Sequence, residues 1–253
     1  MKVNRQEKYG PVTNFFVFKW GNKYSAKYVN RLYNSICKFY KNKFTFTCIT
    51  DDNKEINNNI KIIDYDTFDT FDYPKDRVFT REKLVLFKKF NRGLNIWLDL
   101  DILIHNDITE IIEEETTKPV FIWNYWTYTK ELMKHQYGRG GQCFVNSSFV
   151  KWKDNQGEHI YDSLVDKSKY AFYTYKSLDK YLFYQHYRKN HLLFWKEGLF
   201  YNYNFSKTYN KSAVCCIFNT SHLKDNSAYE LHEANDWVRE IWSSYELDKV
   251  INN

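Results

Sequence analysis

The chain has 253 residues, of which 43% are hydrophobic, 20% aromatic and 27% charged. A chain of this length and composition builds a full hydrophobic core, which excludes a mainly disordered protein. The mean hydropathy is −0.68, and no apolar run approaches the about 20 residues that a membrane-spanning helix needs. The N-terminal stretch from Met1 to Lys8 lacks the apolar core of a signal peptide, so we expect a cytoplasmic protein without a transmembrane segment.

The net charge of +6 favours anionic partners such as phosphate-bearing small molecules. Acidic and basic residues alternate along most of the chain without a dense basic tract, so we expect no nucleic-acid partner. The five cysteines include no Cys-x-x-Cys pair and are expected to be reduced thiols. Metal-ligand spacing is also missing among five histidines, which we expect to be surface or core residues: His135, His159, His186, His191 and His232.

In the first half of the chain, apolar runs alternate with helical spacing. Tyr28, Leu32, Ile36 and Phe39 recur every three or four residues, which places them on one helix face. The predicted elements in chain order are a strand at 14–19, a helix at 25–40, strands at 44–50 and 60–64, a helix at 81–90 and a strand at 95–99. This order predicts an open α/β sheet with parallel pairs.

The second half is less regular. Its predicted strands lie at 119–124, 142–152 and 213–218, and its predicted helices at 158–165, 178–187 and 236–250. We find no internal repeat and no linker, so the chain 1–253 is predicted to form a single domain.

Two acidic residues, Asp99 and Asp101, stand inside the apolar run from Trp97 to Ile104. Burying unpaired carboxylates is costly, so such a pair needs a cation. If the strand ends at Asp99, both acids lie at its carboxyl edge, where open α/β sheets place ligands. Carboxylates together with substrate phosphates are typical of a Mg²⁺ or Mn²⁺ site. The alternative is a pair that faces solvent or a neighbouring lysine.

The surrounding motifs resemble nucleotide-sugar glycosyltransferases of the GT-A fold, and most closely the bacterial and phage-borne members near glycosyltransferase family 8. The resemblance begins with a K-L-x-L-F segment at 83–87, followed by the apolar strand ending in D-x-D and by Asp107-Ile108. It continues through Phe144-Val145-Asn146-Ser147-Ser148, Lys151-Trp152, Leu178-Asp179-Lys180-Tyr181-Leu182 and Trp237-Val238-Arg239-Glu240-Ile241-Trp242.

The resemblance implies a GT-A open sheet, mixed but mostly parallel, flanked by helices. It also implies a nucleotide-sugar-binding half at about 10–110 and an acceptor-side half at about 111–253. The implied activity is metal-dependent transfer of a sugar, of hexosyltransferase type, from a nucleotide-sugar donor, expected to be a UDP-sugar. The sugar would pass to a glycan or another hydroxyl acceptor with retention of configuration. Alternatives are a sugar-phosphate nucleotidyltransferase and a glycan- or nucleotide-binding protein without transferase activity.

The resemblance also implies site residues. Asp99 and Asp101 would hold Mn²⁺ or Mg²⁺, and Asp179 and Lys83 would be catalytic. Where the family has a third ligand, a histidine, this chain has Asn219, with His222 three residues on; either would complete the site. The expected donor-binding residues are Phe18, Trp20, Gly21, Lys23, Tyr24, Thr50, Asp52, Arg77, Arg81, Lys83, Asp99, Leu100, Asn146 and Ser147.

Four of these residues have plain structural alternatives. The aromatic rings of Trp20 and Tyr24 would stack on the nucleotide base or else belong to the core. Lys83 would contact the donor or else lie on a solvated helix face. Asp179 would lie near the reacting carbon or else cap a helix together with Ser177. The turn at 19–23 lacks the Gly-rich phosphate loop of nucleotidyltransferases, which argues against that class.

Overall fold

The computed structural model describes residues 12–68, 81–126, 143–166, 168–175, 177–218 and 235–247. The strands are β1 (Thr13–Lys19), β2 (Phe44–Thr50), β3 (Lys61–Asp64), β4 (Leu94–Leu98), β5 (Ile102–Ile104), β6 (Val120–Trp123), β7 (Val145–Lys153), β8 (Leu193–Phe194), β9 (Phe200–Asn202) and β10 (Cys215–Ile217). The α-helices are α1 (Ala26–Phe39), α2 (Val85–Lys89), α3 (Thr109–Glu113), α5 (Glu158–Asp166), α6 (Ser168–Thr174), α7 (Leu178–Gln185) and α8 (Asp236–Leu247). Short 3-10 helices are η1 (Tyr65–Thr67), η2 (Arg81–Leu84) and η3 (Tyr187–Lys189).

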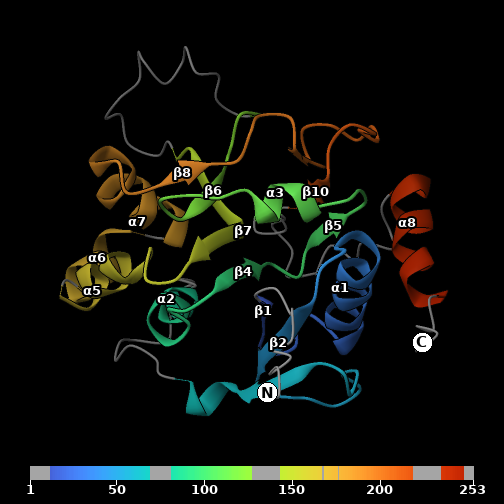
Figure 1. Cartoon of the computed structure of the whole chain (residues 1–253), viewed down its shortest axis with the longest axis horizontal. Helices are drawn as coiled ribbons and strands as arrows, with labels where there is room; N and C mark the ends of the chain where they lie inside the picture. Colours follow the sequence, from blue (N-terminus) through green and yellow to red (C-terminus); the bar gives the residue numbers. More distant parts are fainter. Residues whose placement is uncertain are drawn as a thin grey trace, which may run out of the picture.

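A seven-stranded sheet in the order β3-β2-β1-β4-β7-β6-β8 forms the centre of the molecule (Figure 1). Strand β1 is parallel to both of its neighbours, β2 and β4. After β1 the chain first builds outward through β2 and β3, and then returns to add β4 on the other side of β1. The carboxyl ends of β1 and β4 therefore meet at a topological switch point, which is where open α/β sheets bind ligands.

A smaller three-stranded sheet, in the order β5-β10-β9, stands beside the large one. Strand β5 is antiparallel to β10, and β10 is parallel to β9. Because β4 ends at Leu98 in the large sheet and β5 begins at Ile102 in the small one, residues 99–101 cross between the two sheets. The D-x-D segment is thus a short bridge anchored at both ends.

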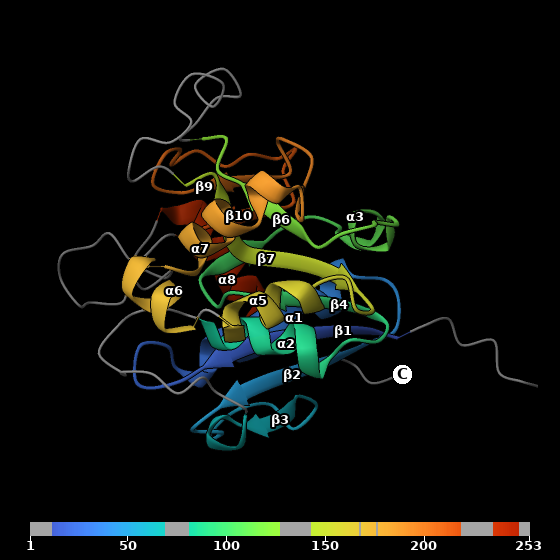
Figure 2. The same ribbon diagram turned by 90° about the vertical axis from the view of Figure 1, so that its left-hand side faces the viewer.

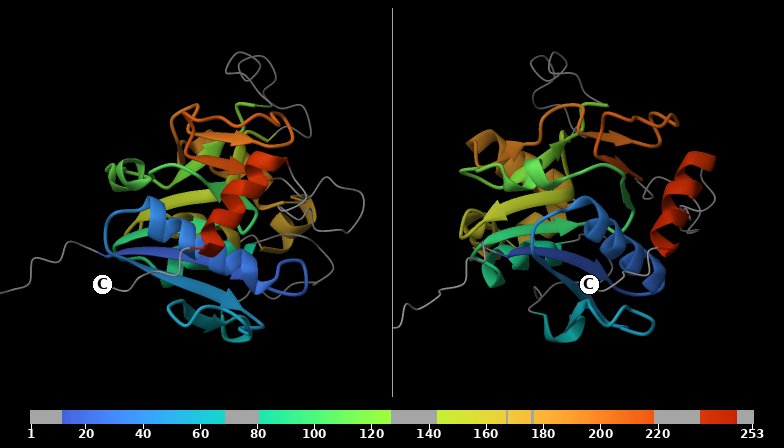
Figure 3. Two further views of the ribbon diagram at one scale, coloured as in Figure 1. Left: turned by 90° about the vertical axis from the view of Figure 1, so that its right-hand side faces the viewer. Right: turned by 45° about the vertical axis from the view of Figure 1, so that its right-hand side comes forward.

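Helices cover both faces of the large sheet. Figure 2 shows α2 and α5 in front of the sheet, and the left view of Figure 3 shows α1 and α8 in front of the opposite face. The spacing predicted for α1 is confirmed, because Tyr28, Leu32 and Ile36 are all buried. On the other face Phe87 of α2 packs against Trp97 of β4, with ring centroids 5.1 Å apart.

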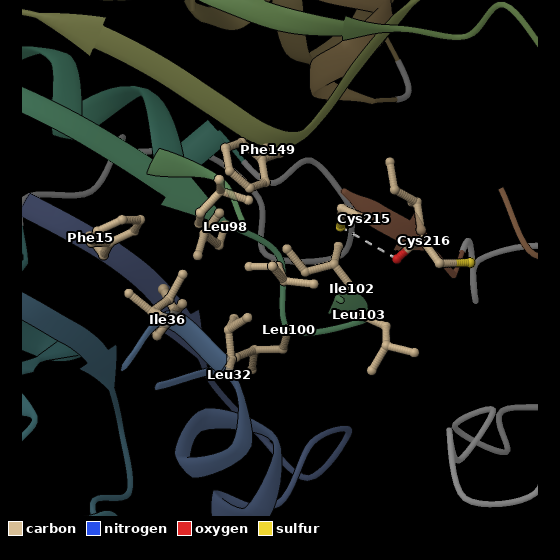
Figure 4. Packing of buried hydrophobic residues seen from close by; sticks show 14 of the residues in the cluster. Phe15, Leu32, Ile36, Leu98, Leu100, Ile102, Leu103, Phe149, Cys215 and Cys216 are labelled. Carbon is tan, nitrogen blue, oxygen red and sulfur yellow. Dashed lines mark hydrogen bonds between the residues drawn. The ribbon is translucent and has the colours of Figure 1, made fainter. Parts of the chain in front are cut away.

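The core on the α1 side continues into the small sheet (Figure 4). Leu32 and Ile36 of α1 lie near Leu98, Leu100 and residues of β5 and β10 in one cluster of buried side chains. The expectation of reduced cysteines is confirmed, since all five are free thiols. Cys215 and Cys216 are fully buried in β10, where they act as small apolar side chains.

The sequence predicted most elements within one or two residues. One difference is that β4 ends at Leu98, so Asp99 follows the strand instead of ending it. The segment predicted as one helix at 81–90 begins with the 3-10 turn η2, whose residues are all buried. Strands β5, β8 and β9 were not predicted because each has only two or three residues. In the described part of the chain, no helix combines the length and the apolar character needed to cross a bilayer.

The packing of α5 against α2 generates a stability prediction at Gly157. A Cβ atom added there would lie 2.2 Å from Cδ1 of the buried Phe87 ring. We expect Gly157→Ala to lower the free energy of unfolding by about 1–3 kcal/mol, because the ring must move within a close-packed core. Asn155→Ala, at an exposed position in the same turn, is the control and should change it by less than about 0.5 kcal/mol. Equal unfolding midpoints in urea for Gly157→Ala and wild type would contradict this packing.

Candidate active site

The bridge from Asp99 to Asp101 is fixed by backbone hydrogen bonds on both sides. The N–H group of Asp99 donates to the carbonyl of Ser148 in β7 at 2.8 Å, and the N–H group of Phe218 donates to the carbonyl of Asp101 at 3.0 Å. Between them the Leu100 side chain is only 3% exposed and packs in the core. The two acidic residues remain partly exposed. The bridge therefore holds both carboxylates at the carboxyl edge of β4.

Lys83 lies next to the carboxyl edge of β4. Its ammonium group forms an ion pair with Oδ1 of Asp99. The Lys83 side chain is 8% exposed and that of Asp99 is 24% exposed, so the carboxylate is the solvent-facing partner. The interpretation of Lys83 as a residue on a solvated helix face is therefore wrong. The alternative in which the paired acids meet a neighbouring lysine is realised for Asp99, by the same lysine that was expected to face the donor.

Asp179 lies near the Lys83–Asp99 ion pair and belongs to a different element, helix α7. It is the second residue of α7, and its Oδ1 accepts hydrogen bonds from the N–H group of Ser147 at 3.1 Å and from the Ser147 hydroxyl at 2.6 Å. The helix is capped by Ser177, whose side chain accepts from the N–H group of Lys180. Ser177, and not Asp179, therefore caps the helix. The Asp179 carboxylate instead joins α7 to Ser147 of β7.

The electrostatics show that these groups share one environment. Burial raises the pKa of Asp179 to about 6, while the hydrogen bond from Ser147 and the charge of Lys83 act in the opposite direction. The negative charge of Asp99 adds to the rise. Asp179 is therefore mostly ionised at neutral pH, and Ser147 and Lys83 both stabilise its charged form against the effect of burial.

The ends of β1 and β2 are tied together beside this cluster. The Lys19 ammonium group donates to the carbonyl of Asp52 at 3.0 Å, and the Thr50 hydroxyl donates to the same carbonyl at 2.9 Å. Gly21 has a φ of +61°, which favours glycine, and its N–H group donates to Asp51 at 2.8 Å. The sequence did not single out Lys19 and Asp51, because their contacts join the ends of two different strands. These contacts shape the turn that carries the expected donor-binding residues.

Aromatic rings line the same edge. Trp20 is 38% exposed and stacks on Tyr65 with ring centroids 5.8 Å apart. Phe18 is 7% exposed and meets the Trp20 ring edge-on. Tyr24 contacts Tyr28 of α1 at 5.0 Å and belongs to the border of the core. Trp20 is thus the ring whose exposure suits stacking on a base.

Several other expected residues have structural partners. Lys23 lies over the Tyr24 ring at 4.8 Å. Arg81 is buried and pairs with Glu82 at 2.7 Å, so its charge is largely balanced within η2. Asn146 accepts a hydrogen bond from the N–H group of Ser148 at 3.0 Å, at the start of β7, the segment that Asp179 contacts through Ser147. Three expected residues lie outside the described part of the chain: Arg77, Asn219 and His222.

The donor set at the bridge fits a hard divalent cation. Asp99 and Asp101 offer carboxylate oxygens at a partly exposed edge, and Mg²⁺ and Mn²⁺ are held in proteins by one or two carboxylates together with phosphate oxygens. The ion pair with Lys83 uses Oδ1 of Asp99 and leaves its second oxygen as a ligand atom. Removing a carboxylate from water costs free energy, and both the Lys83 ammonium group and a bound divalent cation would offset that cost for Asp99.

The Asp179 environment predicts a pH-dependent stability difference. Because the pKa of the native carboxyl lies near 6, above the 3.8 of an unperturbed group, its contribution to stability is full below pH 3.8 and is lost as the pH rises through 6. Asp179→Asn keeps the acceptor for Ser147 and removes this titration. From about pH 4 to about pH 7 the variant should gain on the order of 2–3 kcal/mol relative to wild type.

Urea unfolding in metal-free buffer measures this difference, with Asp166→Asn at an exposed position of α5 as the control. A difference between Asp179→Asn and wild type that stays constant across this pH range would contradict the assignment.

Comparisons with known proteins agree with the fold. No protein-family model matches the sequence, and no curated protein matches it significantly. Galactosyltransferase LgtC, solved with donor and acceptor sugar analogues, is 12% identical with a TM-score of 0.58, over 91% of this chain and 95% of its own. Glycosyltransferase GlyE of Streptococcus pneumoniae is 10% identical with a TM-score of 0.61, over 94% and 61%. Mouse xyloside xylosyltransferase 1 is 10% identical with a TM-score of 0.53, over 84% and 100%. The predicted GT-A fold is therefore confirmed.

Proposed function

We propose that the protein is a metal-dependent glycosyltransferase of the hexosyltransferase type. It moves a sugar from a nucleotide-sugar donor, a UDP-sugar, to a hydroxyl group of a glycan or another acceptor, with retention of configuration. The observation that carries this proposal is the convergence of Lys83, Asp99 and Asp179 beside Asp101 at the switch point of a GT-A sheet. The likeness to LgtC, which was solved with donor and acceptor sugar analogues, supports it.

The leaving diphosphate determines what the site must supply. Glycosyl transfer proceeds through an oxocarbenium-like transition state in which negative charge grows on the departing phosphate. A divalent cation, when bound, would neutralise part of that charge. Asp99 and Asp101 would hold Mn²⁺ or Mg²⁺, with Asn219 or His222 as the third protein ligand. Lys83, fixed by its ion pair with Asp99, would direct a second positive charge at the donor.

Asp179 is assigned to the reacting sugar. Its carboxylate is held on two hydrogen bonds from Ser147 and is ionised at neutral pH. A partly desolvated carboxylate stabilises the positive charge that develops at the anomeric carbon more strongly than a hydrated one. In a double displacement, which retains configuration, a carboxylate of this kind lies on the face of the sugar opposite the diphosphate. We therefore assign the catalytic roles to Asp179 and Lys83.

The remaining donor contacts come from the turn after β1. Trp20 would stack on the uracil ring from its exposed position above Tyr65. Gly21, Thr50 and Asp52 would meet the ribose and base through the tied ends of β1 and β2. We assign residues of about 10–110 to the donor and those of about 111–253 to the acceptor.

Removing the expected metal ligand Asp101 should weaken the binding of UDP and Mn²⁺ without unfolding the protein. In wild type, UDP with Mn²⁺ should raise the melting temperature, whereas UDP with EDTA should not, because a ligand that binds only the folded state stabilises it by mass action. Asp101→Asn keeps the shape of the side chain and removes its charge. The variant should melt close to wild type without ligand and should lose most of the shift caused by UDP and Mn²⁺.

The matched control is Asp166→Asn, which removes an exposed carboxylate far along the chain from the bridge and should keep the full shift. If Asp101→Asn kept a wild-type shift with UDP and Mn²⁺, the bridge would not hold the metal. If wild type gave no shift with any nucleotide and Mn²⁺, the proposed function itself would fail.

A further inference from the structure

Three histidines from separate segments converge on the face of the sheet covered by α5 and α7. His159 lies in the first turn of α5, His186 directly follows α7, and His191 follows η3. One ring nitrogen of each lies within 4.8 Å of those of the other two. Nδ1 of His186 and Nδ1 of His191 are 3.1 Å apart, close to the separation of two ligands bound to one zinc ion at about 2.0–2.1 Å each. No residue spacing indicates this cluster, because His159 is distant from the other two histidines along the chain.

The hydrogen bonds around His186 orient its ring toward the cluster. Its Nε2 lies 3.1 Å from the hydroxyls of both Ser163 and Tyr181. Those hydroxyls are 2.7 Å from each other, and each also lies within hydrogen-bond distance of the carbonyl of Ile160. With these partners on Nε2, Nδ1 of His186 faces Nδ1 of His191, and the tautomer protonated at Nε2 is the one that offers its Nδ1 lone pair to a metal. Metal-binding histidines are held in this way by a partner on the second ring nitrogen.

The surroundings of the other two rings also disfavour a positive charge on them. Burial lowers the pKa of both His159 and His191, and a metal binds only a neutral imidazole. The positive charges of Lys189 and Lys118 lower the pKa of His191 further. Asp162 acts in the opposite direction on His159, but that carboxylate is shared with Lys88 at 3.6 Å.

The position in the fold also favours a cation. His186 is the C-terminal cap of α7, and the carbonyl end of a helix carries partial negative charge. His159 is exposed, so the cluster opens to solvent and an ion can enter. Three imidazoles with one position left for water form a ligand set that zinc accepts, whereas Mg²⁺ and Ca²⁺ prefer oxygen ligands. This preference separates the cluster chemically from the carboxylates of the bridge.

We propose that His159, His186 and His191 form a second metal site, which binds Zn²⁺ and fastens the C-terminal end of α7 to α5. The site is separate from the carboxylates Asp99 and Asp101, and its three ligands are not among the residues assigned to the donor or the reacting sugar. Its role is to hold the two helices together: the ion would add to the contact between Tyr181 of α7 and the Ile160 carbonyl of α5. Because Asp179 lies at the other end of α7, fastening this helix also steadies the carboxylate assigned to the reacting sugar.

Zinc binding by untagged protein, stripped with EDTA and dialysed, tests the proposal. Wild type should bind one equivalent of Zn²⁺ in a competition titration with a chromogenic chelator, and Zn²⁺ should raise the melting temperature. His159→Asn and His191→Asn should each weaken Zn²⁺ binding by more than about tenfold, since even the outer partners of metal ligands are worth about 10–100-fold. Both variants keep His186 and its contacts with Ser163 and Tyr181, and both should keep the shift caused by UDP and Mn²⁺.

Two controls make the result specific. Lys189→Gln changes a neighbour of His191 and keeps all three imidazoles, so Zn²⁺ should bind it at least as tightly as wild type. Asp101→Asn should keep Zn²⁺ binding while it loses the response to UDP and Mn²⁺, which separates a failure of this proposal from a failure of the proposed function. Wild type that binds no Zn²⁺, or His159→Asn and His191→Asn that bind it as wild type does, would overturn the proposal.

Discussion

The crossing of the chain between two sheets is the constraint on which the candidate site depends. Strand β4 belongs to the large sheet and β5 to the small one, and only residues 99–101 connect them. Leu100 anchors the middle of this bridge in the core (Figure 4), and β7 and Phe218 hold its ends through backbone hydrogen bonds. Two carboxylates are thereby fixed at the switch point without relying on their own side-chain contacts. This rigidity is what a preorganised charged site requires.

The charges at this edge favour function over stability. Lys83 and Asp99 form a largely desolvated ion pair, and such pairs seldom stabilise a fold more than apolar side chains of the same size would. Asp179 is kept ionised next to Asp99 even though burial and that neighbour both oppose its charge. Groups with strongly perturbed pKa values cluster at active sites, although structural ion pairs perturb them too. A second observation supports an active site here: these charged groups lie at the carboxyl edge of β4, where open α/β sheets bind ligands.

Much of the fold was predictable because periodicity and apolar runs report burial directly. The spacing of Tyr28, Leu32 and Ile36 predicted the buried face of α1, and the β-branched and aromatic run at 44–50 predicted β2 with its observed bounds. The three-residue strand β5 carries too few residues for either signal. Its existence depends on pairing with β10, which lies more than a hundred residues away along the chain.

The candidate site was predictable only in part, for a similar reason. The sequence pattern singled out Lys83, Asp99 and Asp179, and the structure brings these three together. The sequence pattern did not reveal that Ser147 holds Asp179 through two hydrogen bonds, because such contacts depend on how α7 packs on β7. The histidine cluster was missed in the same way. Long-range packing assembles such sites, and no local spacing encodes it.

Donor hydrolysis tests the central claim most directly. When no acceptor is present, water is the hydroxyl compound that can take the sugar, so a panel of nucleotide sugars with Mn²⁺, followed by NMR, reports the donor and the first anomer released. The account predicts Mn²⁺-dependent release of sugar from a UDP-sugar with retained configuration. It also predicts a rate at least about tenfold lower in Lys83→Met, because removing a buried charged contact costs about 2–5 kcal/mol. No hydrolysis of any nucleotide sugar, or an unchanged rate in Lys83→Met, would contradict the account.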